Sequence, residues 1–233
     1  VHGGGPQIAE KLKNKNIDSK FIDGLRVTDK DTVKVVEDVL ANEINAEIVK
    51  SINDSGGKAV GLSGNKNTLL SASKLKLEVK DSDSNIEKLV DIGFVGQPTK
   101  VNTNLIKHHI KDGEIPVIAP LGIDDEGNSY NINADTAAGF IAGELEASKL
   151  LLLTDVPGIL DQDKKLISSL TLDDASKIID EDFIVGGMKP KILTCVEAMK
   201  KGVNKTTILD GRIPHSVVLE LFTEHGIGTQ IYS

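Results

Sequence analysis

Strand and helix signals alternate along the whole of this chain. Short apolar runs typical of buried strands lie at residues 58–62, 115–120, 150–153 and 206–209, with helical periodicity between them. Repeated units of this kind fold into sheets covered by helices, because each element must bury one apolar face. We therefore expect an α/β protein, a three-layer αβα sandwich around a mainly parallel sheet. The expected helices start near Pro6 and Thr28 and span residues 103–111, 136–146, 172–180, 190–201 and 216–222.

The helix after residue 27 has a recognisable start. Thr28, followed three residues later by Asp31, is expected to be its N-cap. Val33, Val36 and Leu40 then share one face, and the apolar stripe continues to residue 52. A single long helix is therefore predicted to end just before the glycine pair at residues 56 and 57.

Residues 69–101 interrupt this pattern, because they alternate in polarity without long helical periods. We expect a β-hairpin excursion there, and an edge strand at residues 229–232. The run at residues 150–153 is typical of a central parallel strand. We expect one domain over residues 1–233, with two lobes at residues 1–148 and 149–233.

Composition limits the classes of function. The 233 residues are 39% hydrophobic and 27% charged, with a formal net charge of −8. An acidic chain without a basic, aromatic-containing stripe is not expected to bind nucleic acid. No apolar run is long enough for a membrane span, so no membrane partner is expected. A single cysteine, Cys195, permits no internal disulfide and fits a reducing cytoplasm.

The glycine run His2-Gly3-Gly4-Gly5-Pro6 lies directly before an expected helix. Glycines let backbone N–H groups approach an anion, and the helix N-terminus adds partial positive charge. The run matches neither a dinucleotide fingerprint nor a P-loop, because Gly-Lys-Ser/Thr does not follow. An anion site and an ordinary tight turn explain it about equally well.

Two further stretches carry polar groups suited to a small acidic substrate. Arg26 precedes a helix cap, where its guanidinium could bind a carboxylate in a bidentate pair or simply tether a loop. Asn131, Asn133 and Asp135 project to one side of an extended chain, immediately before a helix. Asp135 as an N-cap on a polar strand face is the alternative interpretation.

The last third of the chain, like its first residues, places glycines directly before an expected helix. An apolar strand ends in the polar turn 154–159, which is where open α/β sheets bind ligands. Gly186 and Gly187 precede a helix with Lys191 in its first turn. A lysine is slightly disfavoured there by the helix dipole, so its presence indicates a bound anion such as a phosphate.

The histidines have no metal-binding spacing, and no serine lies in a Gly-x-Ser-x-Gly motif. We therefore expect no metal site built from protein side chains alone, and the sequence gives no support to a hydrolase.

Taken together, these motifs resemble the amino acid kinase family over nearly the whole chain and in the family's order. The matching stretches are residues 1–8 (VHGGGPQI), 24–28 (GLRVT), 59–64 (AVGLSG), 93–96 (GFVG), 115–120 (IPVIAP), 130–135 (YNINAD), 152–160 (LLTDVPGIL), 186–191 (GGMKPK) and 210–215 (DGRIPH).

This resemblance implies an N-terminal lobe for an acylated amino acid and a C-terminal lobe for ATP with Mg²⁺. The motifs are most similar to those of members that phosphorylate the side-chain carboxylate of N-acetyl-L-glutamate, an early step of arginine biosynthesis. That carboxylate is already ionised at neutral pH, so no general base is needed. The resemblance also implies a cytoplasmic homo-oligomer, a dimer or a hexamer.

Site residues follow from the same resemblance. Gly4 and Gly5 would bind the reacting end of the substrate, and Arg26, Asn131 and Asn133 would hold the rest. Lys191 would stabilise the transferring phosphoryl group, and Asp135 would position the catalytic lysines as an organiser and not as a base. The nucleotide site would be formed by Asp155, Val156, Pro157, Gly158, Ile159, Leu160, Phe183, Ile184 and Val185.

In one respect the sequence departs from the family pattern. The family carries an earlier strand and a Lys-x-Gly-Gly loop, whose lysine partners Lys191. No residue here replaces it, so we expect the natural N-terminus to lie upstream of Val1. Without that segment the chain is expected to be inactive or poorly folded.

Two alternative functions remain open from the sequence. One is a kinase for an acylated aminoadipate-type substrate of lysine biosynthesis, whose motifs overlap with these. The other is a non-catalytic sensor of the same fold that binds a nucleotide or an amino acid. Arg26 with Asn131 favours N-acetyl-L-glutamate, and the presence of Asp135 and Lys191 favours catalysis.

Overall fold

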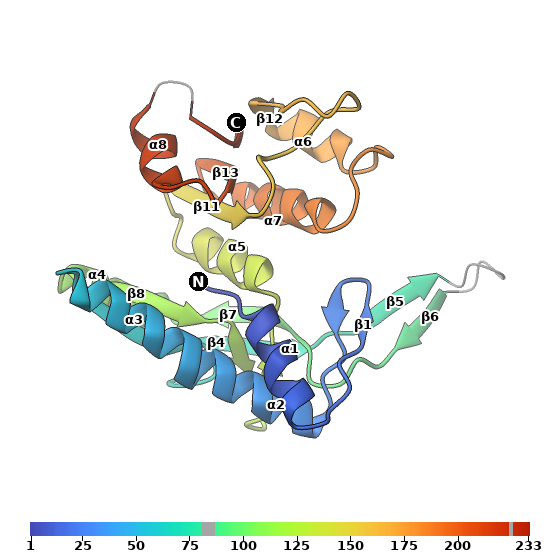
Figure 1. Cartoon of the computed structure of the whole chain (residues 1–233), viewed down its shortest axis with the longest axis vertical. Coiled ribbons are helices and arrows are strands. Elements are labelled where there is room, and N and C mark those ends of the chain that lie inside the picture. Colours follow the sequence, from blue (N-terminus) through green and yellow to red (C-terminus); the bar gives the residue numbers. More distant parts are fainter. Residues whose placement is uncertain (81–86, 224–225) are drawn as a thin grey trace. The chain divides into compact units, whose positions relative to one another are not determined.

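The computed structural model in Figure 1 describes residues 1–80, 87–223 and 226–233. The chain divides into two compact units, unit 1 over Val1–Ala137 and unit 2 over Ala138–Ser233. This division falls within a helix, whereas the sequence placed the boundary between two lobes at residue 148. The fold is mixed α/β, with parallel strand pairs and helices in both units, as expected.

In its described residues unit 1 combines helices with a four-stranded sheet and three two-stranded sheets, β1-β2, β3-β8 and β5-β6. Strands β3 and β8 pair in parallel, and a four-stranded sheet has the order β10-β9-β4-β7. Its elements, in chain order, are α1 (Gly5–Asn14), β1 (Phe21–Ile22), β2 (Leu25–Arg26), α2 (Lys30–Glu37), η1 (Asp38–Ile44), α3 (Asn45–Asp54), β3 (Ala59–Ser63), β4 (Leu70–Lys74), β5 (Leu77–Lys80), β6 (Glu87–Val90), β7 (Gly96–Val101), α4 (Thr103–Lys111), β8 (Ile115–Ala119), β9 (Leu121–Ile123) and β10 (Ser129–Asn131).

The hairpin excursion expected at residues 69–101 is confirmed. Strand β4 pairs antiparallel with β7, and β5 pairs antiparallel with β6, so one hairpin extends the other. Figure 1 shows β5 and β6 projecting from the rest of unit 1. Residues 81–86 lie outside the described part of the chain.

The long helical segment after residue 27 differs from the prediction in two ways. Its N-cap is Asp29 and not Thr28, because the Asp29 carboxylate accepts from the amides of Asp31 and Thr32 at 3.1 and 2.8 Å. The hydroxyl of Thr28 is instead bonded to the carbonyl oxygen of Arg26 at 2.8 Å. The segment also contains a π-helical stretch, η1, between α2 and α3. Apolar periodicity does not reveal such a stretch, because the same face stays buried across it.

The helical core of unit 1 forms where α1, α2 and η1 meet β8 and β9. These helical segments pack through aliphatic side chains, which fits the low aromatic content of 3%. Each fully buried leucine or isoleucine contributes roughly 1.5–3 kcal/mol through burial. The buried members of this cluster are Ile8, Leu12, Val35, Val36, Val39, Leu40, Ile44, Ala119 and Leu121.

The turn between β9 and β10 supports a prediction on pH. Burial and a 2.9 Å hydrogen bond to Asp124 raise the pKa of Tyr130 to about 12. An unfolded tyrosine ionises near its ordinary value of about 10. The stabilisation from the neutral phenol is therefore complete below about pH 10 and is lost as the pH rises towards about 12.

We expect this loss to be specific to Tyr130. The difference in unfolding free energy between the wild type and Tyr130→Phe, measured with urea at several pH values, should shrink between about pH 10 and 12. A difference that stays constant over that range would show that Tyr130 ionises as it does in the unfolded chain.

Unit 2 is built around one four-stranded sheet with the order β11-β13-β14-β12. Strands β11 and β13 are parallel, and β14 runs antiparallel to β13 but parallel to β12. The elements are the remainder of α5 (Ala134–Glu144), which begins in unit 1, then β11 (Lys149–Thr154), β12 (Ser169–Thr171), α6 (Leu172–Ile178), α7 (Met188–Lys200), β13 (Lys205–Asp210), α8 (Ser216–Phe222) and β14 (Thr229–Tyr232).

The prediction that residues 229–232 form an edge strand is wrong, because β14 lies between β13 and β12. Strand β12 has only three residues, Ser169–Thr171, which is too short to give a strand signal in the sequence. Within the described residues β11 pairs with β13 alone, and Leu153 at its end is 48% exposed. The apolar run at residues 150–153 is therefore buried on one face in this unit.

The buried carboxylate of Glu220 holds the C-terminal strand in place. It accepts hydrogen bonds from Thr207 Oγ1 at 3.1 Å and from the amides of Ile227 and Gly228 at 2.9 and 3.3 Å. Glu220 is only 8% exposed, so removing its side chain leaves buried donors without an acceptor.

We expect Glu220→Ala to destabilise the protein by about 2–4 kcal/mol in urea unfolding. A matched control is Glu197→Ala on α7, where the exposed Glu197 pairs with Lys200 at 3.0 Å. That change should cost less than about 0.5 kcal/mol. Equal effects of the two changes would contradict the anchoring role of Glu220.

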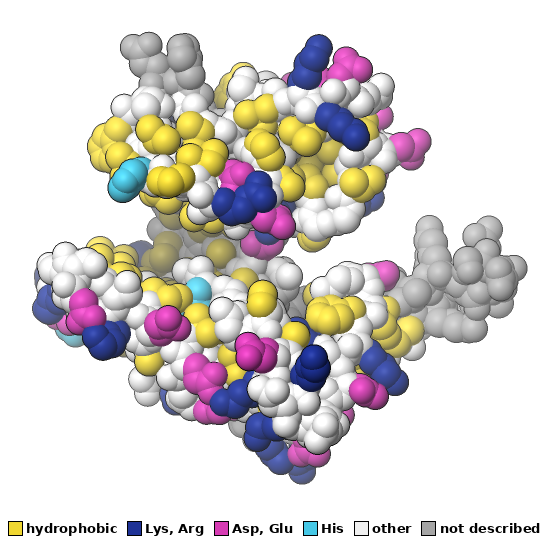
Figure 2. All heavy atoms as spheres, in the orientation of Figure 1, with side chains coloured by type: hydrophobic (Ala, Val, Ile, Leu, Met, Phe, Trp, Pro, Cys, Tyr) yellow, Lys and Arg dark blue, Asp and Glu magenta, His cyan; other side chains and the backbone are white. Residues whose placement is uncertain are grey.

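The surface carries no single-sign field in the view of Figure 2, where acidic and basic side chains are interspersed on each unit. Among the described residues, no helix is both long and apolar enough to cross a membrane.

Candidate substrate and nucleotide pockets

The glycine run begins helix α1 and lines a pocket of about 200 Å³ in unit 1. Gly4 is the N-cap residue of α1, and Pro6 lies in its first turn. Within the described ranges, the amides of Gly4 and Gly5 donate to no protein acceptor, which is usual for the first N–H groups of a helix. These amides can therefore donate hydrogen bonds to an anion.

The absence of a side chain at Gly4 is a packing requirement. A Cβ there would collide with the side chains of Leu40 and Ile44, both from the π-helical segment η1. No atom lies within 4 Å of a Cβ built at Gly5, so that position is not restricted by packing. Gly4 therefore brings its backbone closer to η1 than any other residue could.

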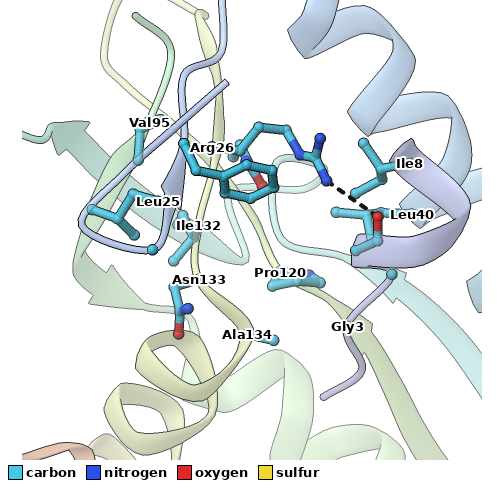
Figure 3. Close-up of a pocket in the computed structure, with 15 residues that line it drawn as sticks. Gly3, Ile8, Leu25, Arg26, Leu40, Val95, Pro120, Ile132, Asn133 and Ala134 are labelled. Carbon is cyan, nitrogen blue, oxygen red and sulfur yellow. Dashed lines mark hydrogen bonds between the residues drawn. The ribbon is translucent and has the colours of Figure 1, made fainter. Parts of the chain in front are cut away.

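Arg26 reaches the same pocket from strand β2, as Figure 3 shows. Its guanidinium donates to the carbonyl oxygen of Gly5 at 3.1 Å and to the hydroxyl of Ser19. The residue is only 7% exposed, and burial lowers the pKa of the guanidinium. No carboxylate of the described residues lies within salt-bridge distance of it. A buried cation without a counter-ion is costly, and an acidic ligand would remove that cost.

Asn131 is tied to the strand that carries Arg26. Its Nδ2 donates to Thr28 Oγ1 at 3.4 Å, and that hydroxyl donates to the carbonyl oxygen of Arg26 at 2.8 Å. The backbone N–H of Asn131 donates to the carbonyl oxygen of Phe94 at 2.9 Å. Asn131 and Arg26, which are far apart in the sequence, therefore line one pocket.

Asn133 and Asp135 differ in position from the extended arrangement expected for residues 131–135. The strand ends at Asn131, and α5 begins at Ala134, so alternation stops before Asp135. The side chain of Asn133 caps α5, since its Oδ1 accepts from the amide of Thr136 at 3.1 Å. Asn133 lines the pocket together with Asn131, whereas Asp135 lies in the first turn of the helix.

The sequence did not single out Phe21, which also lines this pocket. Its ring lies over the guanidinium of Arg26, with Cζ 4.6 Å from the ring centroid, and Phe21 is 55% exposed. Phe21 is one of five phenylalanines in the sequence, and both its exposure and its contact with Arg26 appear only in the folded chain.

A second pocket, of about 270 Å³, lies in unit 2. It is formed by the loop after β11, by the segment before α7 and by the first turn of α7 itself. Most of the residues expected at a nucleotide site line it. They are Asp155, Val156, Gly158, Leu160, Phe183, Ile184 and Val185. The predicted catalytic residue Lys191 lines the same pocket, as do Thr154, Gly187 and Met188, which belong to the motifs at residues 154–159 and 186–191.

Pro157 and Ile159 do not line this pocket. The side chain of Ile159 is fully buried in the core of unit 2, and its amide donates to Thr229 Oγ1 at 2.8 Å. Gly158 has a φ of +152° and packs so closely on Thr229 that a Cβ would approach Oγ1 to 2.6 Å. Thr229 therefore anchors this loop to the sheet through contacts that only glycine and a small hydroxyl permit.

Helix α7 directs its N-terminus at the second pocket, with Gly187 as N-cap and Lys191 in the first turn. No acidic residue lies in that first turn. A helix N-terminus with a lysine beside it is suited to a phosphate. Lys189, which the sequence regarded as less specific, is exposed and pairs with Asp180 at 3.1 Å.

The carboxyl ends of β11 and β13 meet at one edge of the sheet, because the two strands are parallel. The amide of Gly211 donates to the carbonyl oxygen of Thr154 at 2.8 Å and joins the two loops. Asp210 forms a two-pronged pair with Arg212, at 2.8 and 2.9 Å, which holds the pKa of its carboxyl below the usual range. The charge of Asp155 also raises the pKa of Arg212. This edge therefore carries charged groups from both loops.

Among the described residues, no group of three or more His, Cys, Asp or Glu side chains could hold a metal ion. A Mg²⁺ ion needs few protein ligands when a nucleotide supplies phosphate oxygens.

Comparison with known proteins relates the chain to one family. The model of the amino acid kinase family matches residues 1–210. An acetylglutamate kinase of Rhodospirillum centenum is 55% identical over 232 residues, which cover 99% of this chain and 76% of that protein.

Solved structures show the same fold. The N-acetylglutamate synthase of Neisseria gonorrhoeae, complexed with coenzyme A and N-acetyl-glutamate, aligns over the whole of this chain with a TM-score of 0.82 and 26% identity. This chain spans about half of the length of that synthase, 51%. A carbamate kinase of Giardia, only 16% identical, aligns over 99% of this chain and 82% of its own, with a TM-score of 0.64.

The family match and the relative at 55% identity leave one conclusion. The chain belongs to the amino acid kinase family.

Proposed function

We propose that this protein is an acetylglutamate kinase, which transfers the terminal phosphoryl group of ATP to the side-chain carboxylate of N-acetyl-L-glutamate. Relatives with that name are 53–55% identical to it over at least 99% of its length. The structural observation that carries the proposal is the buried Arg26 guanidinium in the unit 1 pocket, without a protein carboxylate as partner among the described residues.

The unit 1 pocket suits this acceptor substrate. N-acetyl-L-glutamate carries two carboxylates, so one can pair with Arg26 while the other accepts hydrogen bonds from the backbone amides of Gly4 and Gly5. Asn131 and Asn133 offer amide groups that can bond to the acetamido group. The reacting carboxylate is ionised at neutral pH, so the residues of the pocket need only bind and orient it.

The unit 2 pocket suits ATP. Its apolar side chains, such as Val156, Leu160 and Phe183, can cover a base, and the N-terminus of α7 can receive phosphates. Lys191 would stabilise charge on the phosphoryl oxygens during transfer. Mg²⁺ would reach this pocket on the phosphates and would neutralise part of their charge.

The proposal also includes a homo-oligomer in the cytoplasm, and Asp135 as the residue that orients catalytic lysines. The substrate carboxylate that accepts the phosphoryl group is already ionised, so Asp135 is not needed as a base. A carboxylate in the first turn of a helix, such as that of Asp135, is stabilised by the helix dipole.

The decisive experiment is a comparison of acceptors. The full-length natural protein would be incubated with ATP and with N-acetyl-L-glutamate, glutamate, aspartate or an acylated aminoadipate, and the acyl phosphate would be trapped with hydroxylamine. We expect the strongest signal with N-acetyl-L-glutamate. A stronger signal with the aminoadipate derivative would assign the lysine-type reaction, and ligand binding without product would assign a sensor.

A further inference from the structure

His2 stands directly before the glycine run, and both nitrogens of its ring are engaged. Nδ1 lies 3.0 Å from the carbonyl oxygen of Gly3, and Nε2 lies 3.1 Å from Nδ2 of Asn45. A carbonyl oxygen can only accept, so Nδ1 carries the proton in this arrangement. Nε2 must then accept from Asn45.

The orientation of Asn45 is itself determined by two strands. Asn45 is the first residue of α3, directly after the π-helical segment η1, and is only 4% exposed. Its Nδ2 donates to the carbonyl oxygen of Val117 at 2.9 Å and lies 3.5 Å from that of Leu62. Turning the amide over would place Oδ1 against these carbonyls, which repel it.

Asn45 therefore selects one state of His2. A protonated ring would direct Nε2–H at the amide donor of Asn45, which cannot accept it. Burial acts in the same direction, since it lowers the pKa of His2. Asn45 and the carbonyls of β3 and β8 that surround it are neutral.

The hydrogen bond from His2 to the carbonyl oxygen of Gly3 acts on the orientation of the Gly3–Gly4 peptide plane. In a trans peptide the C=O and the following N–H point in opposite directions. Holding the carbonyl of Gly3 against His2 therefore directs the N–H of Gly4 away from His2. A run of three glycines has little rotational preference of its own, so an external anchor is required to fix this plane.

We propose that His2, held by Asn45 with its proton on Nδ1, is a positioning residue that fixes the Gly3–Gly4 peptide and so aims the Gly4 N–H for ligand binding in the unit 1 pocket. Only the identity of the ligand in this inference rests on the proposed function. The orientation of the peptide is a property of the protein without ligand.

The test compares His2→Leu, which loses the donor, with His2→Asn, whose Nδ2 occupies the place of Nδ1 and can still donate to Gly3. His108→Leu is the matched control, because His108 is an exposed histidine on α4, with Nε2 3.7 Å from Asp112. In the wild type, two-bond proton–nitrogen correlations should show the His2 proton on Nδ1. Asn45→Asp, which replaces the donor by an acceptor, should place a proton on Nε2.

Residual dipolar couplings of the Gly4 N–H then report the orientation of the peptide without ligand. We expect a changed coupling in His2→Leu and an unchanged one in His2→Asn and His108→Leu. Binding of N-acetyl-L-glutamate, measured by calorimetry, should weaken about tenfold in His2→Leu and less than about threefold in His2→Asn.

The outcomes separate this inference from the proposed function. An unchanged Gly4 coupling in His2→Leu, or a wild-type ring with its proton on Nε2, would overturn the positioning role. Couplings that follow the expectation in a protein that does not bind N-acetyl-L-glutamate would support the positioning role and would count against the proposed ligand instead.

Discussion

Arg26→Ala is expected to weaken binding of N-acetyl-L-glutamate on the order of 100-fold, because the change removes a buried, charge-assisted pair with a carboxylate. Arg26→Lys keeps the charge but not the planar fork that can bond to two carboxylate oxygens at once. It should therefore weaken binding by about tenfold. Calorimetric titration of the ligand measures both effects.

The stability of the ligand-free protein distinguishes a binding role from a structural one. Arg26 is buried without a carboxylate from the described residues, so its removal also removes the cost of burying a charge. We expect Arg26→Ala to lose most of the rise in melting temperature that the ligand causes, with a small change in the ligand-free protein.

The control for Arg26 is Lys20→Ala, which removes another cation at an exposed position just before the β1–β2 hairpin that carries Arg26. Its affinity should match that of the wild type. Equal affinities of Arg26→Ala and the wild type would show that the acidic ligand does not bind at this guanidinium.

Lys191→Met is expected to lower kcat by about 10²–10³-fold, while the Kd of ATP changes by less than about tenfold. Electrostatic stabilisation of a transferring phosphoryl group acts mainly in the transition state, so its loss lowers the rate more than the affinity. Methionine keeps the length of the side chain and removes the charge. Rates would be followed by hydroxylamine trapping and ATP binding by calorimetry.

Lys189→Met provides a matched control on the same helix. Lys189 lies two residues earlier, is exposed and pairs with Asp180 at 3.1 Å. This change should leave both kcat and the Kd of ATP within about twofold of the wild type. A similar loss of rate in both variants would mean that general positive charge, and not the position of Lys191, supports transfer.

The comparison of the sequence with the structure shows where local patterns are informative. Apolar spacing predicted the class of fold, the hairpin excursion at residues 69–101 and most helices, because these signals arise within a few residues. The N-cap at Asp29 and the inner place of β14 were predicted wrongly. The place of β14 depends on a partner distant in sequence, the three-residue strand β12. The N-cap depends on which of two neighbouring side chains reaches the helix amides, and the hydroxyl of Thr28 bonds to the carbonyl oxygen of Arg26 instead.

The candidate site shows the same division. The sequence singled out Gly4, Gly5, Arg26, Asn131 and Asn133, and all of them line the unit 1 pocket. Their roles as ligands of N-acetyl-L-glutamate stay predictions. Phe21, Asn45 and the two engaged nitrogens of His2 had no signal in the sequence, because their contacts join residues that are separated by a turn or by a whole helix.

By itself the sequence determined the alternation of strands and helices and the glycine positions before two helices. Those properties depend on residue type and short spacing. Only the tertiary structure decided that Arg26 is buried without a carboxylate partner from the described chain, and that Asn45 fixes the proton of His2. Burial and hydrogen-bond direction arise when separate segments pack together, and residue order does not specify them locally.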